Sequence, residues 1–175
     1  MNIDLFNKER QPSTVQLESV CELFKRATPE FDEQSKKENS DTCTARARPD
    51  DYRKLLETKT LLLITKNRDE VTALLEWDSR EKDDVTLAYI TWILVAEENR
   101  GQGLASLLHT QFEEECMPNV IRNATSETIY QALGVHLKNP AIDIYRKWGY
   151  DETNAPQWND GRKLFMVKSP PRCIT

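Results

Sequence analysis

The feature that most constrains the fold of this 175-residue chain is a run of three strand-like segments between residues 60 and 96. The segments "TLLLITK", "EVTALLEWD" and "VTLAYITWILVA" are rich in β-branched and aromatic residues, and short polar links separate them. Residues of these types are enriched in strands, because their side chains pack well on a pleated surface. The pattern therefore predicts three successive strands of one sheet, joined as an antiparallel meander.

Helical and strand patterns on both sides of this meander predict a mixed α/β fold. Ser13 and Gln16 resemble a capping box at the start of one helix. Pro49 suits the first turn of a second helix. The other predicted elements are a strand at 2–6, a helix from Leu104, a strand over "IYQALGVHL", a short helix capped by Asn139 and opened by Pro140, and a last strand after a turn at Asp160–Gly161.

The helix predicted over "GLASLLHTQFEEE" is amphipathic. Leu104, Leu107, Leu108 and Phe112 follow one stripe at helical spacing, which predicts that they face the core. His109 is expected to lie on the surface of this helix.

The composition is typical of one globular domain, which we expect to span residues 1–175. Hydrophobic residues make up 38% and charged residues 30%, with both signs mixed. The net charge of −5 and the lack of a long basic run argue against binding nucleic acid. No segment approaches the roughly 20 apolar residues that span a membrane, and the first residues do not resemble a signal peptide. We therefore expect a cytoplasmic protein without a membrane partner.

The cysteines and histidines carry no metal-binding pattern. The four cysteines are widely spaced and form no CxxC pair, which favours free thiols in a reducing compartment. With only two histidines in the chain, we expect no metal site.

The stretch "NRGQGLASLL" places two glycines directly before the predicted helix. A helix start offers unpaired N–H groups and a partial positive charge, which together attract phosphate. Gly101 and Gly103 lack the Cβ atoms that would hold an anion away, and Arg100 adds a cation, so the turn suits a pyrophosphate. The chain has neither a Gly-Lys-Ser/Thr triplet nor the third glycine of a GxGxxG turn, which argues against both nucleotide-binding motifs. A turn needed only for packing remains the alternative.

The same stretch resembles the acetyl-coenzyme A signature of the GNAT superfamily of N-acyltransferases. Arg100, Gly103 and Ala105 match its pattern Gln/Arg-x-x-Gly-x-Gly/Ala, five residues after a strand-ending valine. A second stretch, "LGVHLKNPAIDIYRKWGY", is similar to the family's strand, Asn, helical Tyr and Gly-Tyr/Phe ending. The resemblance covers about residues 87–150, the expected coenzyme-binding core. It implies a mixed, largely antiparallel sheet of about seven strands that splays between two parallel central strands, with about four flanking helices.

The resemblance also implies which residues bind acetyl-coenzyme A as a co-substrate. Backbone groups of three strand residues would bind the pantetheine arm and polarise the thioester: Ile93, Leu94 and Val95. The turn would wrap the pyrophosphate with Arg100, Gly101, Gln102, Gly103, Leu104, Ala105 and Ser106. Asn139 would also face the coenzyme, unless Lys138 takes that place, because the spacing from Asn139 to Tyr145 is one residue shorter than is usual. A role for Asn139 as a helix cap alone stays open.

Tyr145 falls where the family often has a general acid that protonates the departing thiolate, and a tyrosine that only packs in the core is the alternative. The acceptor amine must lose a proton before it attacks. For a lysine-like amine of pKa about 10.4, this costs roughly 4–5 kcal/mol at pH 7. We therefore expect a general base, with His136, Glu76 and Tyr89 as candidates. Each has a structural alternative, respectively a hydrogen-bonded strand residue, an exposed edge charge and a packing aromatic.

These observations predict an N-acetyltransferase that transfers an acetyl group from acetyl-coenzyme A to a primary amine by direct attack in a ternary complex. No cysteine accompanies the motifs, which argues against a covalent acyl-enzyme. The alternatives are a catalytically idle coenzyme-binding or protein-interaction module on the same fold, and a transferase for a longer acyl group. The acceptor, a small-molecule or protein amine, would be shaped by residues 28–47 and 150–162, whose mixed charges select no substrate. Exposed apolar residues such as Trp158 would suit a homodimer interface or a substrate wall.

Overall fold

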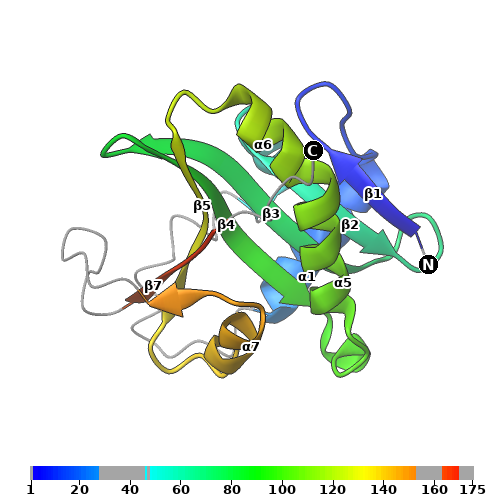
Figure 1. Cartoon of the computed structure of the whole chain (residues 1–175). Helices are drawn as coiled ribbons and strands as arrows, with labels where there is room; N and C mark the ends of the chain where they lie inside the picture. Colours follow the sequence, from blue (N-terminus) through cyan, green and yellow to red (C-terminus); the bar gives the residue numbers. More distant parts are fainter. Residues whose placement is uncertain (1, 28–45, 47, 153–162, 170–175) are drawn as a thin grey trace. The chain divides into compact units, whose positions relative to one another are not determined.

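The computed structural model describes residues 2–27, 46, 48–152 and 163–169, and its strands form a seven-stranded sheet in the order β1-β2-β3-β4-β5-β7-β6 (Figure 1). The strands are β1 (Asn2–Phe6), β2 (Thr60–Thr65), β3 (Val71–Lys82), β4 (Val85–Val95), β5 (Thr128–His136), β6 (Asp151–Glu152) and β7 (Lys163–Lys168). The pair β4–β5 is parallel, whereas β1–β2, β5–β7 and β6–β7 are antiparallel. The predicted mixed sheet with a parallel central pair is confirmed.

The helices also follow the predicted order. They are α1 (Thr14–Ala27), α4 (Pro49–Leu55), η2 (Glu97–Asn99), α5 (Leu104–Gln111), η3 (Phe112–Cys116), α6 (Met117–Asn123) and α7 (Ile142–Lys147). The capping box of α1 is confirmed, because the Ser13 N–H donates to Gln16 Oε1 at 2.9 Å and the Gln16 N–H donates to Ser13 Oγ at 3.1 Å. Within the described ranges, no helix combines the length and apolar character that crossing a membrane requires. The turn predicted at Asp160–Gly161 lies outside the described residues.

The chain divides into two compact units, described separately below. Unit 1 comprises Met1–Glu76 and Trp92–Phe112, and unit 2 comprises Trp77–Thr91 and Glu113–Thr175. The core of unit 1 consists of apolar side chains from α1, α4, β2 and the strands beside them. Its buried members include Phe6, Leu17, Val20, Leu23, Phe24, Tyr52, Leu61, Leu63 and Leu74. Complete burial of one such side chain contributes about 1.5–3 kcal/mol, so this core holds α1 and α4 together.

The helix α5 of unit 1 corrects two predictions about its buried side. Leu104 and Leu108 are buried as predicted, but Leu107 is 42% exposed and His109 is only 3% exposed. Because a helix has 3.6 residues per turn, each step of four residues goes slightly beyond one full turn, so a line of such residues winds slowly around the helix. The stripe that passes through Leu104, Leu108 and Phe112 therefore turns away from Leu107 and towards His109. The rings of His109 and Phe112 accordingly lie 6.2 Å apart, measured between centroids.

Unit 2 contains the hairpin between β3 and β4 and the parallel pairing of β4 with β5. Asp83 and Asp84 join β3 to β4 with φ angles of 51° and 60°, which is typical of the two-residue turn in an antiparallel hairpin. The parallel register runs from Val85–Thr128 to Ile90–Leu133. One face of these strands carries a small apolar layer of Val85, Leu87, Tyr89, Tyr130, Ala132, Phe165 and Val167.

Candidate active site

The glycine turn of unit 1 leads from β4 into α5. The Arg100 N–H donates to the Glu97 carbonyl at 3.2 Å and so ends the short helix η2. Gly101 and Gly103 then have φ angles of +73° and +78°, in the left-handed region that other residues rarely adopt. The backbone of the turn therefore requires glycine for its conformation.

The space in front of both glycines is open. A Cβ atom built on Gly101 or Gly103 would meet no other atom within 4 Å. The first hydrogen bond of α5 runs from the Leu107 N–H to the Gly103 carbonyl at 3.0 Å, so the N–H groups of residues 104–106 precede the helical ladder. These N–H groups and the helix dipole place a partial positive charge at the turn, which favours the binding of a phosphate.

Charged side chains border this turn. Arg100 is exposed, and its Nε donates to the Val95 carbonyl at 3.4 Å. Arg26 of α1 pairs with Glu98 at 3.3 Å. A pocket of about 140 Å³ lies beside the turn, lined by Leu23, Arg26, Val95, Ala96, Glu97, Glu98 and Arg100. Its two arginines and two glutamates balance one another, so the side chains give the pocket lining no net charge.

Ile93, Leu94 and Val95 close β4 in unit 1. The parallel register ends at Ile90, so these three residues lie beyond the paired stretch of β4. The Leu94 side chain is buried, and the N–H of the next residue, Ala96, donates to the Thr72 carbonyl of β3 at 2.8 Å. Core packing and β3 therefore fix the backbone at the end of β4.

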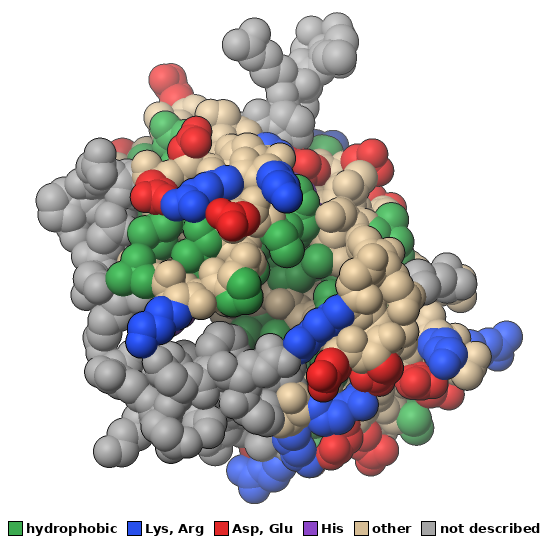
Figure 2. All heavy atoms as spheres, turned by 90° about the horizontal axis from the view of Figure 1, so that it is seen from below, with side chains coloured by type: hydrophobic (Ala, Val, Ile, Leu, Met, Phe, Trp, Pro, Cys, Tyr) green, Lys and Arg blue, Asp and Glu red, His purple; other side chains and the backbone are tan. Residues whose placement is uncertain are grey.

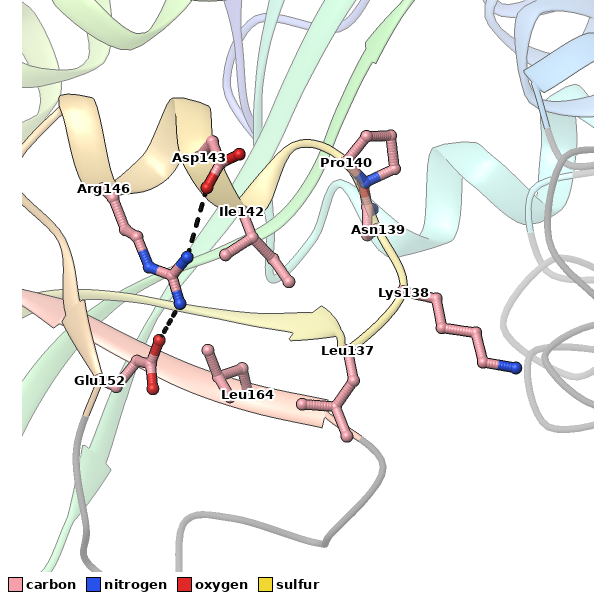
Figure 3. Close-up of a pocket in the computed structure, with 9 residues that line it drawn as sticks. All are labelled: Leu137, Lys138, Asn139, Pro140, Ile142, Asp143, Arg146, Glu152 and Leu164. Atoms are coloured by element: carbon pink, nitrogen blue, oxygen red, sulfur yellow. Dashed lines mark hydrogen bonds and ion pairs between the residues drawn. The ribbon is translucent and has the colours of Figure 1, made fainter.

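In unit 2, Asn139 lies in the turn just before α7. Its side-chain oxygen accepts a hydrogen bond from the Ala141 N–H at 2.9 Å, and its carbonyl accepts one from the Ile142 N–H at 3.2 Å. The predicted cap at Asn139 is wrong, because α7 begins at Ile142 with Ala141 as its N-cap and without a side-chain cap; Asn139 instead stabilises the turn before the helix. Lys138 is exposed, and its side chain extends away from the neighbouring pocket (Figure 3).

That pocket has a volume of about 340 Å³ and lies between the start of α7 and the strands β6 and β7 (Figure 3). It is lined by Leu137, Lys138, Asn139, Pro140, Ile142, Asp143, Arg146, Glu152 and Leu164. Arg146 donates to Asp143 at 3.3 Å and also pairs with Glu152. The charge of Arg146 is thus balanced within the pocket wall.

Tyr145 lies on α7 with its side chain half-buried. Its ring centroid is 5.6 Å from that of Trp148 and 6.3 Å from that of Tyr150. Burial raises the pKa of the Tyr145 phenol from 10.0 to about 12. The phenol is therefore protonated at neutral pH and can donate a hydrogen bond.

A buried polar network fixes the neighbour of Tyr145. The Tyr150 hydroxyl donates to Gln131 Oε1 at 2.9 Å, and Gln131 Nε2 donates to Glu113 at 2.8 Å. Lys168 completes the network with an ion pair to Glu113 at 2.6 Å. Burial is the main cause that raises the pKa of Tyr150 well above its ordinary value. This network holds the chain after α7 and was not predicted from the sequence.

His136 ends β5 with its side chain partly buried. Its Nδ1 accepts a hydrogen bond from the Lys138 N–H at 3.3 Å, and its carbonyl accepts one from the Asn139 N–H at 2.8 Å. In the neutral ring, a proton-accepting Nδ1 assigns the proton to Nε2. The arrangement matches the structural alternative of a hydrogen-bonded strand histidine.

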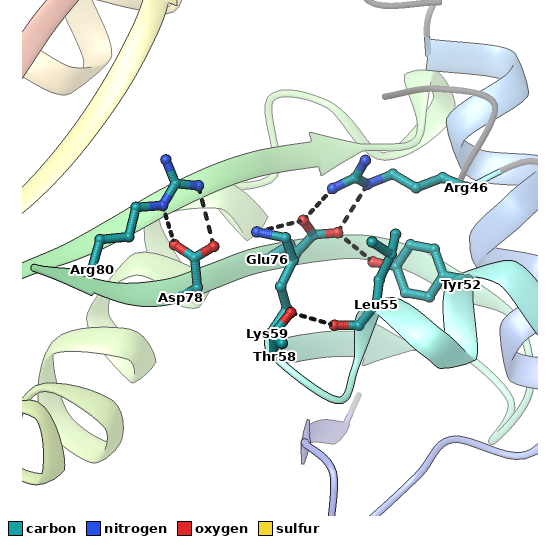
Figure 4. Close-up of polar contacts among 8 residues, drawn as sticks. All are labelled: Arg46, Tyr52, Leu55, Thr58, Lys59, Glu76, Asp78 and Arg80. Carbon is teal, nitrogen blue, oxygen red and sulfur yellow. Dashed lines mark hydrogen bonds and ion pairs between the residues drawn. The ribbon is translucent and has the colours of Figure 1, made fainter. Parts of the chain in front are cut away.

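Glu76 of β3 is completely buried, so the alternative that it is an exposed edge charge is wrong. Arg46 binds both of its carboxylate oxygens, with Nε–Oε2 at 3.0 Å and Nη2–Oε1 at 2.5 Å (Figure 4). The Tyr52 hydroxyl donates to Oε2 at 2.8 Å, and Lys59 Nζ lies 3.9 Å from Oε1. Both carboxylate oxygens are therefore occupied by partners within unit 1.

Arg46 is the partner of Glu76 that sequence reasoning missed. Its guanidinium lies over the rings of Phe24 and Trp92, 5.6 Å and 5.8 Å from their centroids. Thirty residues separate Arg46 from Glu76, and no short-range pattern links them. Burial and the Glu76 carboxylate together raise the pKa of Tyr52 well above its ordinary value.

Tyr89 lies on the apolar layer of unit 2 and is partly buried. Its ring stacks against Phe165 with centroids 6.2 Å apart, and the Arg80 guanidinium lies 3.8 Å from its centroid. Sequence reasoning missed its other neighbour, Gly134 of β5. A glycine within a strand pattern is a known sign of close approach, and it could have indicated this contact.

Most of the two segments expected to shape the acceptor site lies outside the described residues. Of 28–47 and 150–162, the structure describes only Arg46 and residues 150–152. On the face shown in Figure 2, acidic and basic side chains are interspersed. The charges on this face therefore select no acceptor.

The family model that matches this chain covers most of it. Residues 28–168 match the family model of the acetyltransferase (GNAT) domain. No curated protein matches the chain in a sequence search.

Solved structures show the same fold at low sequence identity. The PaiA N-acetyltransferase from Thermoplasma acidophilum, in complex with coenzyme A, has 12% identity and a TM-score of 0.66 over 97% of this chain and 99% of its own. An aminoglycoside 6'-acetyltransferase type Ii has 18% identity and a TM-score of 0.65 over 98% and 99%. Arabidopsis thaliana Naa50, in complex with the bisubstrate analogue CoA-Ac-MVNAL, has 19% identity and a TM-score of 0.55 over 97% and 99%.

Proposed function

Because the chain belongs to the GNAT acetyltransferase domain family, we propose that it transfers an acetyl group from acetyl-coenzyme A to a primary amine, with residues 1–175 acting as one catalytic domain. The observation that carries this proposal is the glycine turn of unit 1. Two left-handed glycines leave the amides before α5 uncovered, and a Cβ at either position would meet nothing within 4 Å. A diphosphate can approach such amides closely, as the phosphate site of this co-substrate requires.

We assign the coenzyme contacts to the residues that the signature implies. The amides of residues 101–106 bind the pyrophosphate, with Arg100 beside them. The backbone of residues 93–95, which lies beyond the β4–β5 ladder, binds the pantetheine arm. Asn139, rather than the outward-pointing Lys138, faces the coenzyme from the start of α7.

Direct attack by the amine requires no nucleophile from the protein. Acetyl-coenzyme A supplies a thioester: the N–C bond forms, the C–S bond breaks, the nitrogen loses one proton and the sulfur gains one. Within the described ranges, Cys21 and Cys116 are free but buried, and burial raises their thiol pKa values to about 11 and about 12. Thiols of this kind are poor nucleophiles at neutral pH, which supports the direct route.

We assign Tyr145 as the group that donates a hydrogen bond to the departing sulfur. Its phenol, with a pKa of about 12, holds its proton more tightly than a thiol of pKa about 8.5. Complete transfer of the Tyr145 proton is therefore unfavourable, so Tyr145 donates a hydrogen bond while the C–S bond breaks, and the released thiolate takes its proton from water. Its loss slows the reaction without abolishing it.

Glu76 and His136 are the two candidate bases with hydrogen-bond partners on the described chain. Glu76 is held by Arg46 and Tyr52 and is sealed from solvent, which favours a structural role. His136 uses its Nδ1 to accept a backbone hydrogen bond. We therefore give neither side chain the role of direct base and assign the proton from the amine to water.

The test is release of free thiol from acetyl-coenzyme A in the presence of a panel of amines. The panel includes polyamines, amino acids, aminoglycosides and peptides with a free N-terminus or lysine. We expect at least one amine to accelerate thiol release well above hydrolysis. Calorimetric binding of acetyl-coenzyme A without acceleration by any amine would instead indicate an idle coenzyme-binding module. Faster turnover with longer thioesters would reassign the acyl group.

A further inference from the structure

Tyr145 of α7 contacts Tyr150 through both its backbone and its ring. The Tyr150 N–H donates to the Tyr145 carbonyl at 3.0 Å across Gly149, whose φ of +88° lies in the left-handed region. A left-handed glycine with such a bond is a common way to end a helix. The two tyrosine rings meet edge to face, with centroids 6.3 Å apart and planes at 70°. The position of the Tyr145 ring therefore depends on where Tyr150 is held.

The strand β5 holds Tyr150 through Gln131. Both side chains are 0% exposed, and the Tyr150 hydroxyl donates to Gln131 Oε1 at 2.9 Å. Gln131 lies within the sheet, where its backbone is paired with Ala88 of β4 on one side and with Lys168 of β7 on the other. The hydroxyl of Tyr150 is therefore attached to the inner part of the sheet and not to a loop.

Glu113 determines how the Gln131 amide is turned. Gln131 Nε2 donates to Glu113 Oε1 at 2.8 Å, and Lys168 Nζ lies 2.6 Å from the same oxygen. A carboxylate only accepts hydrogen bonds, so the nitrogen of the amide must face Glu113 and its oxygen must face Tyr150. Glu113 belongs to η3, a single turn of π-helix, and such turns are frequent at functional sites.

The hydroxyl of Tyr145 is held differently. In the part of the chain that the structure describes, no side-chain hydrogen bond fixes this hydroxyl, and its ring packs edge to face against Trp148 and Tyr150. The direction of the hydroxyl is therefore set by its aromatic neighbours.

Packing alone does not explain the polar side chains behind Tyr150. Replacing both partners of a buried hydrogen bond with apolar groups of similar shape can be nearly neutral for stability, so a phenylalanine facing a leucine could fill the same space. A completely satisfied polar network adds rigidity and one defined arrangement. The network of Tyr150, Gln131 and Glu113 thus gives the Tyr145 ring a fixed neighbour.

We propose that Tyr150 and Gln131 are positioning residues for Tyr145, which keep its hydroxyl aimed at the departing sulfur of the coenzyme. This inference rests on the proposed acetyltransferase function and adds the residues that orient its hydrogen-bond donor. Neither side chain touches a reacting atom, because both act through the Tyr145 ring. Misplacing a group in an active site by about 1 Å costs up to roughly 100-fold in rate, so loosening this support should slow turnover.

The experiment compares Tyr150→Phe with the wild type, using the best amine from the panel. This substitution keeps the ring beside Tyr145 and removes only the hydrogen bond to Gln131. We expect kcat to fall roughly 10-fold while the Kd for acetyl-coenzyme A stays unchanged. Tyr130→Phe is the matched control, because Tyr130 precedes Gln131 on β5 and packs in the apolar layer of the other face. It should leave kcat within twofold of the wild type.

A double-mutant cycle distinguishes positioning from a structural role. In the Tyr145→Phe background no hydroxyl is left to be positioned, so adding Tyr150→Phe should change kcat by less than about twofold. A merely structural role would lower kcat by the same factor in both backgrounds and would overturn the inference. Gln131→Met removes the same hydrogen bond from the side of β5, and it takes the place of Tyr150→Phe in the cycle if that variant shows no cooperative thermal transition.

The outcomes also separate this inference from the proposed function. If the variant used in the cycle keeps kcat within twofold of the wild type, or if Tyr130→Phe shows an equal loss, the positioning role is wrong and the acetyltransferase function still stands. A wild-type protein that neither binds acetyl-coenzyme A nor acetylates any amine would overturn both.

Discussion

In the function that we propose, the glycine turn of unit 1 and Tyr145 of unit 2 act in opposite ways. At the turn, the useful groups are backbone amides, and Gly103 is needed for its φ of +78° while nothing lies within 4 Å of its missing Cβ. In unit 2 the proposed group is the Tyr145 side-chain hydroxyl, and the glycine of that unit, Gly134, is needed for space, because the Tyr89 hydroxyl occupies the place of its Cβ. A backbone site should tolerate loss of side chains but not a change of conformation. A side-chain site should show the reverse.

The largest expected effect is on the stability of unit 1. It tests whether the buried Glu76 stabilises the fold through Arg46 and takes no part in catalysis. Glu76→Ala leaves Arg46 buried without its carboxylate, so it should lower the free energy of unfolding by about 3–5 kcal/mol. Denaturant unfolding measures this value. Asp50→Ala is the control. The Asp50 side chain is 88% exposed and pairs with Arg53, so its removal should change the free energy of unfolding by less than about 1 kcal/mol. A Glu76→Gln variant of normal stability that had lost turnover would reveal a catalytic base instead.

Next in size is the loss of coenzyme affinity on changing the conformation of the turn. Gly103→Val places a β-branched side chain at a left-handed φ and in front of the amides. We expect the Kd for acetyl-coenzyme A to rise at least about 100-fold, equivalent to roughly 2.7 kcal/mol. Calorimetry provides the Kd, and a cooperative thermal transition confirms that the variant is folded. Unchanged affinity in a folded variant would remove the turn from the binding site.

Tyr145→Phe should affect rate and not binding. We expect kcat to fall about 100-fold, with the Kd for acetyl-coenzyme A unchanged. Because the pKa of Tyr145 is raised to about 12, the phenol is protonated throughout pH 6 to 9, and the ratio of mutant to wild-type kcat should stay constant over that range. The steady-state rate of thiol release measures both. A ratio that changes with pH between 6 and 9 would show that Tyr145 titrates there and is not the donor described.

The smallest expected effect is also the sharpest test of a backbone site. Gln102→Ala and Ser106→Ala remove side chains from the turn but keep every amide. Each should change the Kd for acetyl-coenzyme A by less than about threefold, or roughly 0.7 kcal/mol. A loss comparable with that of Gly103→Val would mean that side chains, and not amides, bind the pyrophosphate. The same calorimetric titration applies to all three variants.

Local patterns predicted most of the fold. The capping box of Ser13 and Gln16 was confirmed, because it needs only residues three positions apart. The strands were predicted because β-branched and aromatic residues cluster in them. The parallel central pair of the sheet was predicted from the resemblance and not from any pattern of spacing.

The errors and omissions arose where distant residues meet. From the sequence alone, Glu76 is only a charged residue in a strand. Its buried partner Arg46 is 30 residues away in the chain, so no local pattern links the two. His109 is buried because of a slow drift of the stripe around α5, which a simple count of apolar positions overlooks. The contact of Tyr89 with Gly134 joins neighbouring strands whose register no short motif reveals.

The central claim is that the uncovered amides before α5 bind the diphosphate of acetyl-coenzyme A. The most direct measurement is a titration of the ¹⁵N-labelled full-length protein with acetyl-coenzyme A, followed by amide chemical shifts in NMR. We expect large, saturable shifts at the amides of residues 101–106, and desulfo-coenzyme A, which keeps the diphosphate, should reproduce them. No shifts at millimolar acetyl-coenzyme A, or saturable shifts that exclude this turn, would contradict the account.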